Sequence, residues 1–261
     1  MEKNLWALIL GSSSGFGEAV GLELARLGYN IVGVHFDRRS GLPHVEEVVQ
    51  KMKETGRQVI FFNMNASDTD KRKEVITRIQ QEFAKQPGTI RVLLHSLAFG
   101  TLQSLVASDS NVSKQQMEMT ADVMGHSLVY WVQDLVQNAL MESGGRIYAM
   151  TSSGGSRAMP HYGPVSAAKA ILESHIRQLA VELAPLGITA NSIRAGVTDT
   201  PALRKIPGSD KLIEAAIARN PYKRLTTTQD VAAAIGVLAQ PNTYWITGNV
   251  LGVDGGEDIV G

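Results

Sequence analysis

The 261-residue sequence contains no cysteine, which excludes disulfides and thiolate chemistry. It also carries no excess of either charge, because 25 lysines and arginines balance 25 aspartates and glutamates. That balance favours neither nucleic acid nor an acidic membrane surface as a partner. Long apolar runs are missing as well, since the run before Gly11 has only six residues, too few for a secretion signal or a membrane span. Together these absences favour a cytoplasmic protein.

The residues that are present suit one globular α/β domain over 1–261. Hydrophobic residues make up 44% of the chain and charged residues 19%, as in ordinary soluble proteins. The length is sufficient for a substantial core. We find no linker, low-complexity tract or internal repeat, so a single domain is the simplest prediction.

Apolar runs alternate with helical patterns from end to end of the chain. The runs are apolar enough to be buried on both faces, which predicts strands of a parallel sheet covered by helices. The repeated strand–helix order predicts a doubly wound, seven-stranded parallel Rossmann-type sheet with helices on both faces. Strands are predicted at 6–11, 30–36, 58–65, 91–96, 145–152, 188–196 and 249–256, and helices at 15–27, 43–55, 67–83, about 120–141 and about 162–184.

A glycine-rich loop, GSSSGFG, joins the first predicted strand to the first helix. Glycines there permit a tight turn and a close approach of the backbone to a pyrophosphate, while the helix N-terminus offers free N–H groups. A plain turn between two elements is the alternative. The candidate phosphate-binding residues are Gly11, Ser13, Ser14, Gly15, Phe16 and Gly17.

Tyr162 and Lys169 are separated by six residues on the predicted helix at 162–184. Seven steps of about 100° return to within about 20° of the start, so both side chains share a face. A lysine cation near a tyrosine favours the phenolate and suits proton transfer. The alternative is a core tyrosine beside a surface lysine. Val165, four residues before Lys169, cannot transfer a proton.

The chain resembles the short-chain dehydrogenase/reductase family in several motifs. These are the G-x-x-x-G-x-G loop, Asn65 and Ala66 after the third strand, the segment Gly196 to Thr200, and VDGG at 253–256. The spacing Y-x6-K resembles the enoyl-acyl-carrier-protein reductase subgroup, as do LLHSLAFG at 93–100 and ADVMGHSLV at 121–129. One position departs from the pattern of the enoyl reductase subgroup. Ser152 stands where many enoyl reductases have a second tyrosine and where ketoreductases have their catalytic serine.

This resemblance implies catalysis by Tyr162, Lys169 and Ser152, with a capping or loop serine as the alternative for Ser152. It implies a homotetramer or homodimer and an acyl thioester substrate on acyl carrier protein or coenzyme A. Further residues implied to bind the coenzyme are Asn65, Ala66, Ser96, Leu97, Ala98, Lys169, Gly196, Val197, Thr198 and Thr200.

The choice of coenzyme depends on the end of the second strand. His35 stands where NAD-specific relatives carry an acid, and a histidine cannot chelate a ribose diol. Arg38 and Arg39 offer multidentate contacts to a 2′-phosphate, which favours NADPH. NADH stays open, because Asp37 becomes the ribose-binding acid if the alignment is shifted by two residues. A solvated loop is the alternative for the arginine pair.

Residues 198–221 are predicted to form a substrate lid beyond the carboxyl ends of the strands. Leu203 and Ile206 from this segment, with Phe99 and Met159, are the candidate substrate-binding residues. An ordinary amphipathic helix packed on the core is the alternative. No metal site is predicted, and His95 and His126 are interpreted as structural.

The sequence therefore predicts an NAD(P)H-dependent enzyme of lipid metabolism that reduces the 2,3 double bond of an enoyl thioester. The first alternative is a reductase of a ketone, a quinone or a dienoyl thioester on the same scaffold. The second alternative is a non-catalytic protein that binds a dinucleotide.

Overall fold

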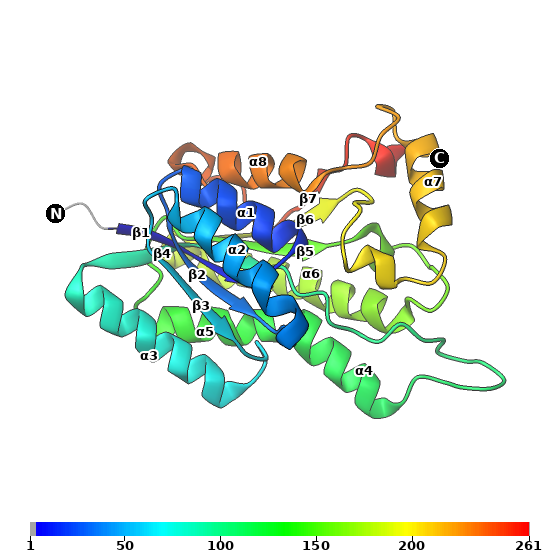
Figure 1. Ribbon diagram of the computed structural model, residues 1–261, viewed down its shortest axis with the longest axis horizontal. Coiled ribbons are helices and arrows are strands. Elements are labelled where there is room, and N and C mark those ends of the chain that lie inside the picture. Colours follow the sequence, from blue (N-terminus) through cyan, green and yellow to red (C-terminus); the bar gives the residue numbers. More distant parts are fainter. Residues whose placement is uncertain (1–3, 261) are drawn as a thin grey trace.

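The computed structural model describes residues 4–260, which form one seven-stranded parallel sheet in the order β3-β2-β1-β4-β5-β6-β7 (Figure 1). The predicted doubly wound fold is thus confirmed. The strand order reverses between β1 and β4, which is the switch point where such sheets bind ligands. The strands are β1 (Asn4–Leu10), β2 (Asn30–His35), β3 (Val59–Asn63), β4 (Gly88–His95), β5 (Arg146–Thr151), β6 (Thr189–Ala195) and β7 (Val250–Val253).

Helices cover both faces of the sheet. Those on one face pack on a core cluster that includes Ile9, Ile31 and Ile193, and those on the other face pack on a cluster that includes Leu8, Leu93 and Ile147. The first set is α1 (Gly15–Arg26), α2 (Leu42–Lys53) and α8 (Thr228–Leu238); the second is α3 (Thr69–Lys85), α5 (Ser127–Gln137) and α6 (Gly163–Leu183). Two more helices, α4 (Lys114–Ala121) and α7 (Ser209–Arg219), extend toward one end of the molecule (Figure 1).

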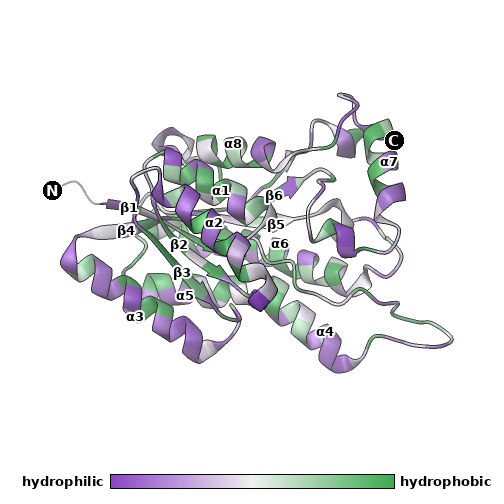
Figure 2. Ribbon diagram, viewed as in Figure 1, coloured by the Kyte–Doolittle hydropathy of each residue, from purple (hydrophilic) through white to green (hydrophobic). Residues whose placement is uncertain are grey.

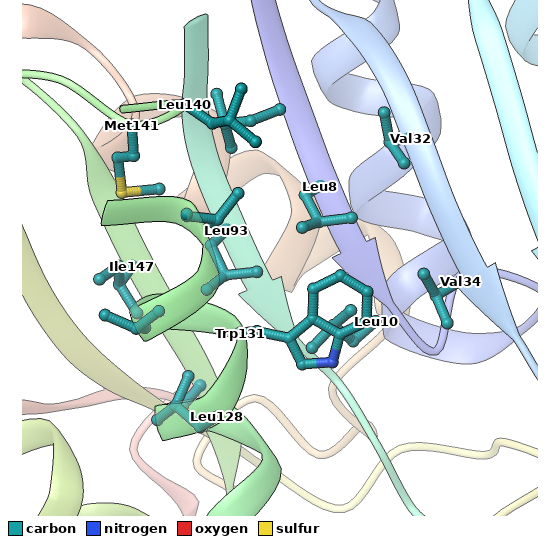
Figure 3. Close-up of a cluster of buried hydrophobic side chains, with 14 of the residues drawn as sticks. Leu8, Leu10, Val32, Val34, Leu93, Leu128, Trp131, Leu140, Met141 and Ile147 are labelled. Atoms are coloured by element: carbon teal, nitrogen blue, oxygen red, sulfur yellow. The ribbon is translucent and has the colours of Figure 1, made fainter. Parts of the chain in front are cut away.

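The strands are buried because both of their faces are covered. Every residue of β2 and of β5 is buried, so alternate side chains along each strand enter opposite clusters. In Figure 3, Trp131 of α5 lies against Leu8, Leu10 and Leu93 of the two central strands. Figure 2 shows the same division, with hydrophobic colours along the strands and hydrophilic colours on much of the outer helix surface.

The predicted helix at about 120–141 differs from the observed one at both ends. Ser113 starts α4 earlier, because its hydroxyl accepts the N–H of Gln116 while the Gln116 side chain accepts the N–H of Ser113. A π-helical segment, η2 (Asp122–His126), then joins α4 to α5, which ends at Gln137. Such segments are frequent beside functional sites.

Two further differences concern elements of the carboxyl-terminal half. Helix α8 was not predicted from the sequence, although a capping box at Thr227 and Asp230 marks its start. Helix α6 begins at Gly163, which leaves Tyr162 as its N-cap.

In the described residues 4–260, no helix is long and apolar enough to cross a membrane.

Candidate active site

A cavity of about 620 Å³ lies where the strands around the switch point end. Most of the residues that the sequence nominated lie on its wall, although Gly17, Arg38 and Arg39 do not. The nominated residues that line it are Gly11, Ser13, Ser14, Gly15, Phe16, His35, Asn65, Ala66, Ser96, Leu97, Ala98, Phe99, Ser152, Met159, Tyr162, Lys169, Gly196, Val197, Thr198, Thr200, Leu203 and Ile206.

The glycine loop forms a tight turn between β1 and α1. Gly11 has φ +87°, and a Cβ there would overlap the carbonyl oxygen of Ser96. Gly17 lies inside the turn, where a Cβ would overlap the carbonyl oxygen of Gly11. It therefore shapes the loop without lining the cavity. Ser14, the N-cap of α1, makes no side-chain hydrogen bond to the helix, so the first N–H groups of α1 are free to meet an anion.

The end of β2 presents an acid, and not the arginine pair, to the cavity. Buried His35 shares a hydrogen bond between Nδ1 and Oδ2 of Asp37, 2.9 Å apart. Asn63 holds the Asp37 backbone from both sides, accepting its N–H at 3.0 Å and donating to its carbonyl at 2.9 Å. Asp37 lines the cavity, whereas Arg38 and Arg39 are exposed and lie outside its wall. Hydrogen bonding thus fixes a carboxylate on the cavity wall just after β2.

Tyr162 faces the cavity from the N-terminus of α6. Its side chain is buried, and this burial raises the pKa of the phenol while a side-chain hydrogen bond with Ser152 opposes the rise. Ser152 follows β5 and its Oγ also accepts the N–H of Gly154 at 3.1 Å. A protonated tyrosine with a hydroxyl neighbour is an arrangement suited to hydrogen-bonding or protonating a substrate oxygen.

Lys169 lies inside the protein, two turns along α6 from Tyr162. Its Nζ donates to the carbonyl oxygens of Met150 at 2.7 Å and Leu97 at 3.5 Å. Burial lowers the pKa of Lys169 to about 8, and the charge of Glu173 opposes this. Glu173 in turn accepts a hydrogen bond from Thr151 Oγ1. The two carbonyls leave one N–H of the ammonium for a ligand in the cavity.

The part of the cavity beyond Tyr162 is apolar. Val123, Met124, Val165 and Tyr162 belong to one buried cluster there, against which Met159 and Ile206 pack. Phe99 is 55% exposed at the rim and makes an edge-to-face contact with Phe36, with ring centroids 6.2 Å apart. An apolar chain or ring can therefore be accommodated next to the tyrosine.

The segment 198–221 covers this apolar end. It contains a short helix, η5 (Leu203–Lys205), and α7, which begins after Gly208 and buries only Ser209 and Ala216. Leu203 is 9% exposed and lines the cavity with Ile206 and Leu212. Helix α7 therefore packs lightly on the body of the protein.

Sequence reasoning did not nominate several other residues of the wall. Arg157 and Arg219 are cations on it, and Met124 and Val165 extend its apolar part. No spacing or motif marks the arginines, because their placement depends on contacts with the distant carboxyl-terminal segment. For Val165, the only signal in the sequence was its place on the same helix as Tyr162.

Two histidines singled out in the sequence do not line the cavity. His95 is fully buried, its Nε2 lies 2.9 Å from Ser127 Oγ, and burial together with the charge of Lys169 lowers its pKa to about 3, so it is neutral. His126 Nδ1 lies 3.0 Å from His175 Nε2 on α6. Within residues 4–260, no three histidine, aspartate or glutamate side chains gather closely enough to hold a metal ion.

A Rossmann-type sheet, a glycine loop at its switch point, and a tyrosine and a lysine on one helix define the class of short-chain dehydrogenases/reductases. Residues 11–257 match the family described as enoyl-(acyl carrier protein) reductase, and the chain belongs to that family.

Three curated relatives match nearly the whole chain. The 1-cyclohexenylcarbonyl-CoA reductase of Streptomyces collinus is 30% identical over 256 residues, which are 97% of this chain and 87% of the relative. The NADPH enoyl-[acyl-carrier-protein] reductase of Staphylococcus aureus is 28% identical and covers 94% of this chain and 91% of its own. A 3-oxoacyl-[acyl-carrier-protein] reductase of Staphylococcus epidermidis also matches, at 26% identity over 97% of this chain and 98% of the relative.

A solved structure shows the same fold. The NADH enoyl-[acyl-carrier-protein] reductase of Aquifex aeolicus superimposes with a TM-score of 0.86, covering 99% of this chain and 98% of its own. Its sequence is 24% identical, so this likeness concerns the fold alone.

Proposed function

We propose that the chain is an NAD(P)H-dependent oxidoreductase that reduces the 2,3 double bond of an enoyl thioester. The observation that carries this proposal is the meeting of Tyr162, Lys169 and Ser152 on one cavity wall, with an apolar chamber beyond the tyrosine. The relatives that act on enoyl substrates support it.

The coenzyme fits the residues present. The free N–H groups at the start of α1 suit the pyrophosphate, and Asn65 and Ala66 line the cavity where the adenine is expected. Val197 and Thr198 suit the nicotinamide end, and Asp37 the ribose. Arg38 and Arg39, on which the prediction of NADPH rested, lie outside the cavity wall, whereas Asp37 lines it, so the residues favour NADH, with NADPH as the alternative. When bound, the coenzyme supplies the hydride that the β-carbon accepts.

The six-residue gap between Tyr162 and Lys169 has a chemical reason in this reaction. In a ketone, the carbon that accepts hydride bears the oxygen that is protonated. In an enoyl thioester the hydride goes to Cβ, and the negative charge develops on the more distant thioester oxygen. Tyr162, at the N-cap of α6, is placed one turn farther from Lys169 than a four-residue spacing would place it. We propose that its hydroxyl hydrogen-bonds that enolate oxygen and gives it a proton; the enol then becomes the saturated thioester when Cα takes up a proton from water and the oxygen returns its proton to Tyr162.

Lys169 and Ser152 prepare the tyrosine and the ligand. The ammonium of Lys169, anchored by the carbonyls of Met150 and Leu97, holds the ribose and places positive charge in the cavity. Ser152 hydrogen-bonds Tyr162 and orients its hydroxyl. The chamber formed by Val123, Met124 and Ile206 receives the acyl group and excludes water.

The test follows oxidation of NADPH and NADH with crotonyl and acetoacetyl thioesters side by side. The proposal expects consumption with the crotonyl thioester, with loss of its double bond. Turnover of the acetoacetyl thioester alone would overturn the enoyl assignment.

A ketone reductase is the second candidate, and the serine at position 152 favours it. Its hydroxyl bonds to Tyr162, which is the pairing expected of the catalytic serine of a ketoreductase, and a 3-oxoacyl reductase is among the relatives. A non-catalytic dinucleotide-binding protein is the third candidate. Measurable coenzyme oxidation with either thioester excludes it.

Predictions on the carrier of the thioester, the location, the domain and the oligomeric state belong to the same proposal. The thioester is expected on acyl carrier protein or coenzyme A, in fatty-acid metabolism and in the cytoplasm, which cell fractionation tests. Residues 1–261 are expected to form one domain, of which residues 1–3 and 261 lie outside the described residues.

Two exposed aromatic residues suit burial in a homodimer or homotetramer. These are Trp245 and Tyr244, which are 86% and 63% accessible and lie beside the edge strand β7.

A further inference from the structure

The segment that follows β7 places two consecutive acids, Glu257 and Asp258, beneath three different parts of the cavity wall. Glu257 is 3% exposed, and its Oε2 accepts the N–H of Val197 at 3.0 Å. Its Oε1 accepts a hydrogen bond from Arg219 at 2.9 Å. Val197 lies in the loop proposed to hold the nicotinamide, and Arg219 is the last residue of α7. One buried carboxylate thus joins the coenzyme loop to the lid.

Asp258 makes the corresponding connection to the loop before Tyr162. Its backbone carbonyl accepts a hydrogen bond from Arg157 at 2.7 Å, and its Oδ1 lies 3.0 Å from the same guanidinium. Its Oδ2 lies 3.1 Å from Arg194 of β6. Arg157, like Arg219, lines the cavity, so both arginines are held by this acidic pair.

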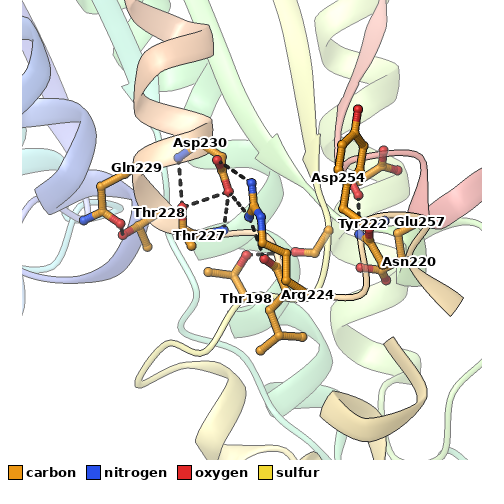
Figure 4. Close-up of polar contacts among 12 residues, drawn as sticks. Thr198, Asn220, Tyr222, Arg224, Thr227, Thr228, Gln229, Asp230, Asp254 and Glu257 are labelled. Atoms are coloured by element: carbon orange, nitrogen blue, oxygen red, sulfur yellow. Dashed lines mark hydrogen bonds and ion pairs between the residues drawn. The ribbon is translucent and has the colours of Figure 1, made fainter. Parts of the chain in front are cut away.

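The segment itself is held firmly in a turn. Asp254 Oδ1 accepts the N–H of Gly256 at 2.9 Å, and its carbonyl accepts the N–H of Glu257 at 3.1 Å and a hydrogen bond from the Asn220 side chain at 2.9 Å. Figure 4 shows Glu257 next to Asp254 and Asn220. Since Asn220 directly follows α7, the turn holds the end of the lid by two separate contacts.

A buried carboxylate is stable as an anion only while its partners stay in place. If α7 moved away, Glu257 would lose Arg219, and one oxygen of a buried carboxylate would lack its donor. If the loop at Val197 moved, the carboxylate would lose a backbone donor. Losing either contact therefore makes the remaining contact of Glu257 less favourable to keep. This links the order of α7 to the position of the loop at Val197.

We propose that Glu257 is a positioning residue that couples coenzyme binding to the order of the lid helix α7. The identity of the coenzyme depends on the function proposed above. Glu257 touches neither the coenzyme nor the substrate in this scheme; it acts through Val197 and Arg219.

The test compares wild-type protein with Glu257→Gln, using amide hydrogen exchange of residues 209–219 and coenzyme affinity measured by fluorescence. Val197 and Arg219 donate to different carboxylate oxygens, and glutamine replaces one of these oxygens with an NH₂ group that only donates, so the connection is cut while the volume is kept. In the wild type, adding NADPH or NADH should slow exchange in α7. In Glu257→Gln, that slowing should be lost and the dissociation constant should rise about tenfold, as expected for losing a charged hydrogen bond.

Asp230→Asn is the matched control. It weakens a separate ion pair between Arg224 and Asp230, which Figure 4 also shows. Neither of these two residues lines the cavity. This variant should behave as the wild type in both measurements. Arg219→Gln cuts the same connection from the lid side and serves if Glu257→Gln fails to fold; it should remove the slowing of exchange as well.

The outcomes separate the two proposals. Coenzyme binding by the wild type without any change in α7, or an unchanged response in both Glu257→Gln and Arg219→Gln, would overturn the coupling and leave the enzymatic proposal intact. Failure of the wild type to bind either coenzyme would overturn both.

Discussion

Tyr162 combines burial with a position at the very start of a helix. Burial raises the pKa of the phenol above its ordinary value, and the hydrogen bond with Ser152 partly offsets that effect. A proton donor with these properties suits an oxygen that becomes basic only during the reaction. We therefore expect the hydroxyl of Tyr162 to be the most important single group of the proposed site.

Replacing Tyr162 with phenylalanine should lower kcat by about 10²–10⁴-fold, the usual contribution of a positioned acid. Coenzyme affinity should remain nearly intact, because the lost hydroxyl faces the substrate. Steady-state kinetics and coenzyme titration measure the two effects. Full turnover in this variant would contradict the assigned role.

Lys169→Ala should differ from Tyr162→Phe by weakening coenzyme binding as well as turnover. The variant removes both the cation and the anchored donor that faces the cavity. The same titration separates the two variants. Equal coenzyme affinity in wild type and Lys169→Ala would show that the ammonium does not hold the ribose.

The lowered pKa of Lys169 predicts a pH dependence of coenzyme affinity. Below about pH 8 the free protein carries the ammonium, which attracts the anionic coenzyme, and above it the amine is neutral. Affinity should therefore be flat at lower pH and weaken as the pH rises through about 8. Fluorescence titrations at several pH values measure this trend, and Lys169→Met, which cannot titrate, should lack it.

At the scale of elements, caps and turns decide where the helices start. Asp68 is the N-cap of α3, and its Oδ1 accepts the N–H groups of Asp70 and Lys71, each at 3.0 Å. Asp68→Ala should lower the free energy of unfolding by about 1 kcal/mol, the typical value of an N-cap. Urea denaturation measures it. Asp70→Ala, whose side chain is 88% exposed in a surface ion pair, should have a smaller effect.

The elements also show why sequence patterns succeed in some places and fail in others. The predicted range 67–83 approximates α3, because capping and apolar periodicity are local signals. The π-helical segment η2 was missed, since its hydrogen-bond pattern has no distinct periodicity in the sequence. The last strand is shorter than predicted, because Gly255 and Gly256 adopt positive φ and turn the chain away from the sheet.

At the scale of the whole molecule, stability depends on the two clusters on either side of the sheet. Leu93 of β4 is fully buried in the cluster of Figure 3. Leu93→Ala should lower the free energy of unfolding by about 2–5 kcal/mol, through lost burial and a residual cavity. Leu186→Ala, at a site 46% exposed, is the matched control. A similar loss in both variants would contradict the role assigned to this cluster.

The sequence alone determined the order of the seven strands and of most helices, the glycine loop and the spacing of Tyr162 and Lys169, because periodicity, turn residues and helical geometry are local properties of the chain. Only the tertiary structure decided which of Asp37, Arg38 and Arg39 meets the cavity, and it alone placed Glu257 and Asp258 beneath the wall. Those positions depend on packing between segments far apart in the chain. Position 257 meets position 197, for example, only because β7 pairs with β6 at the edge of the sheet.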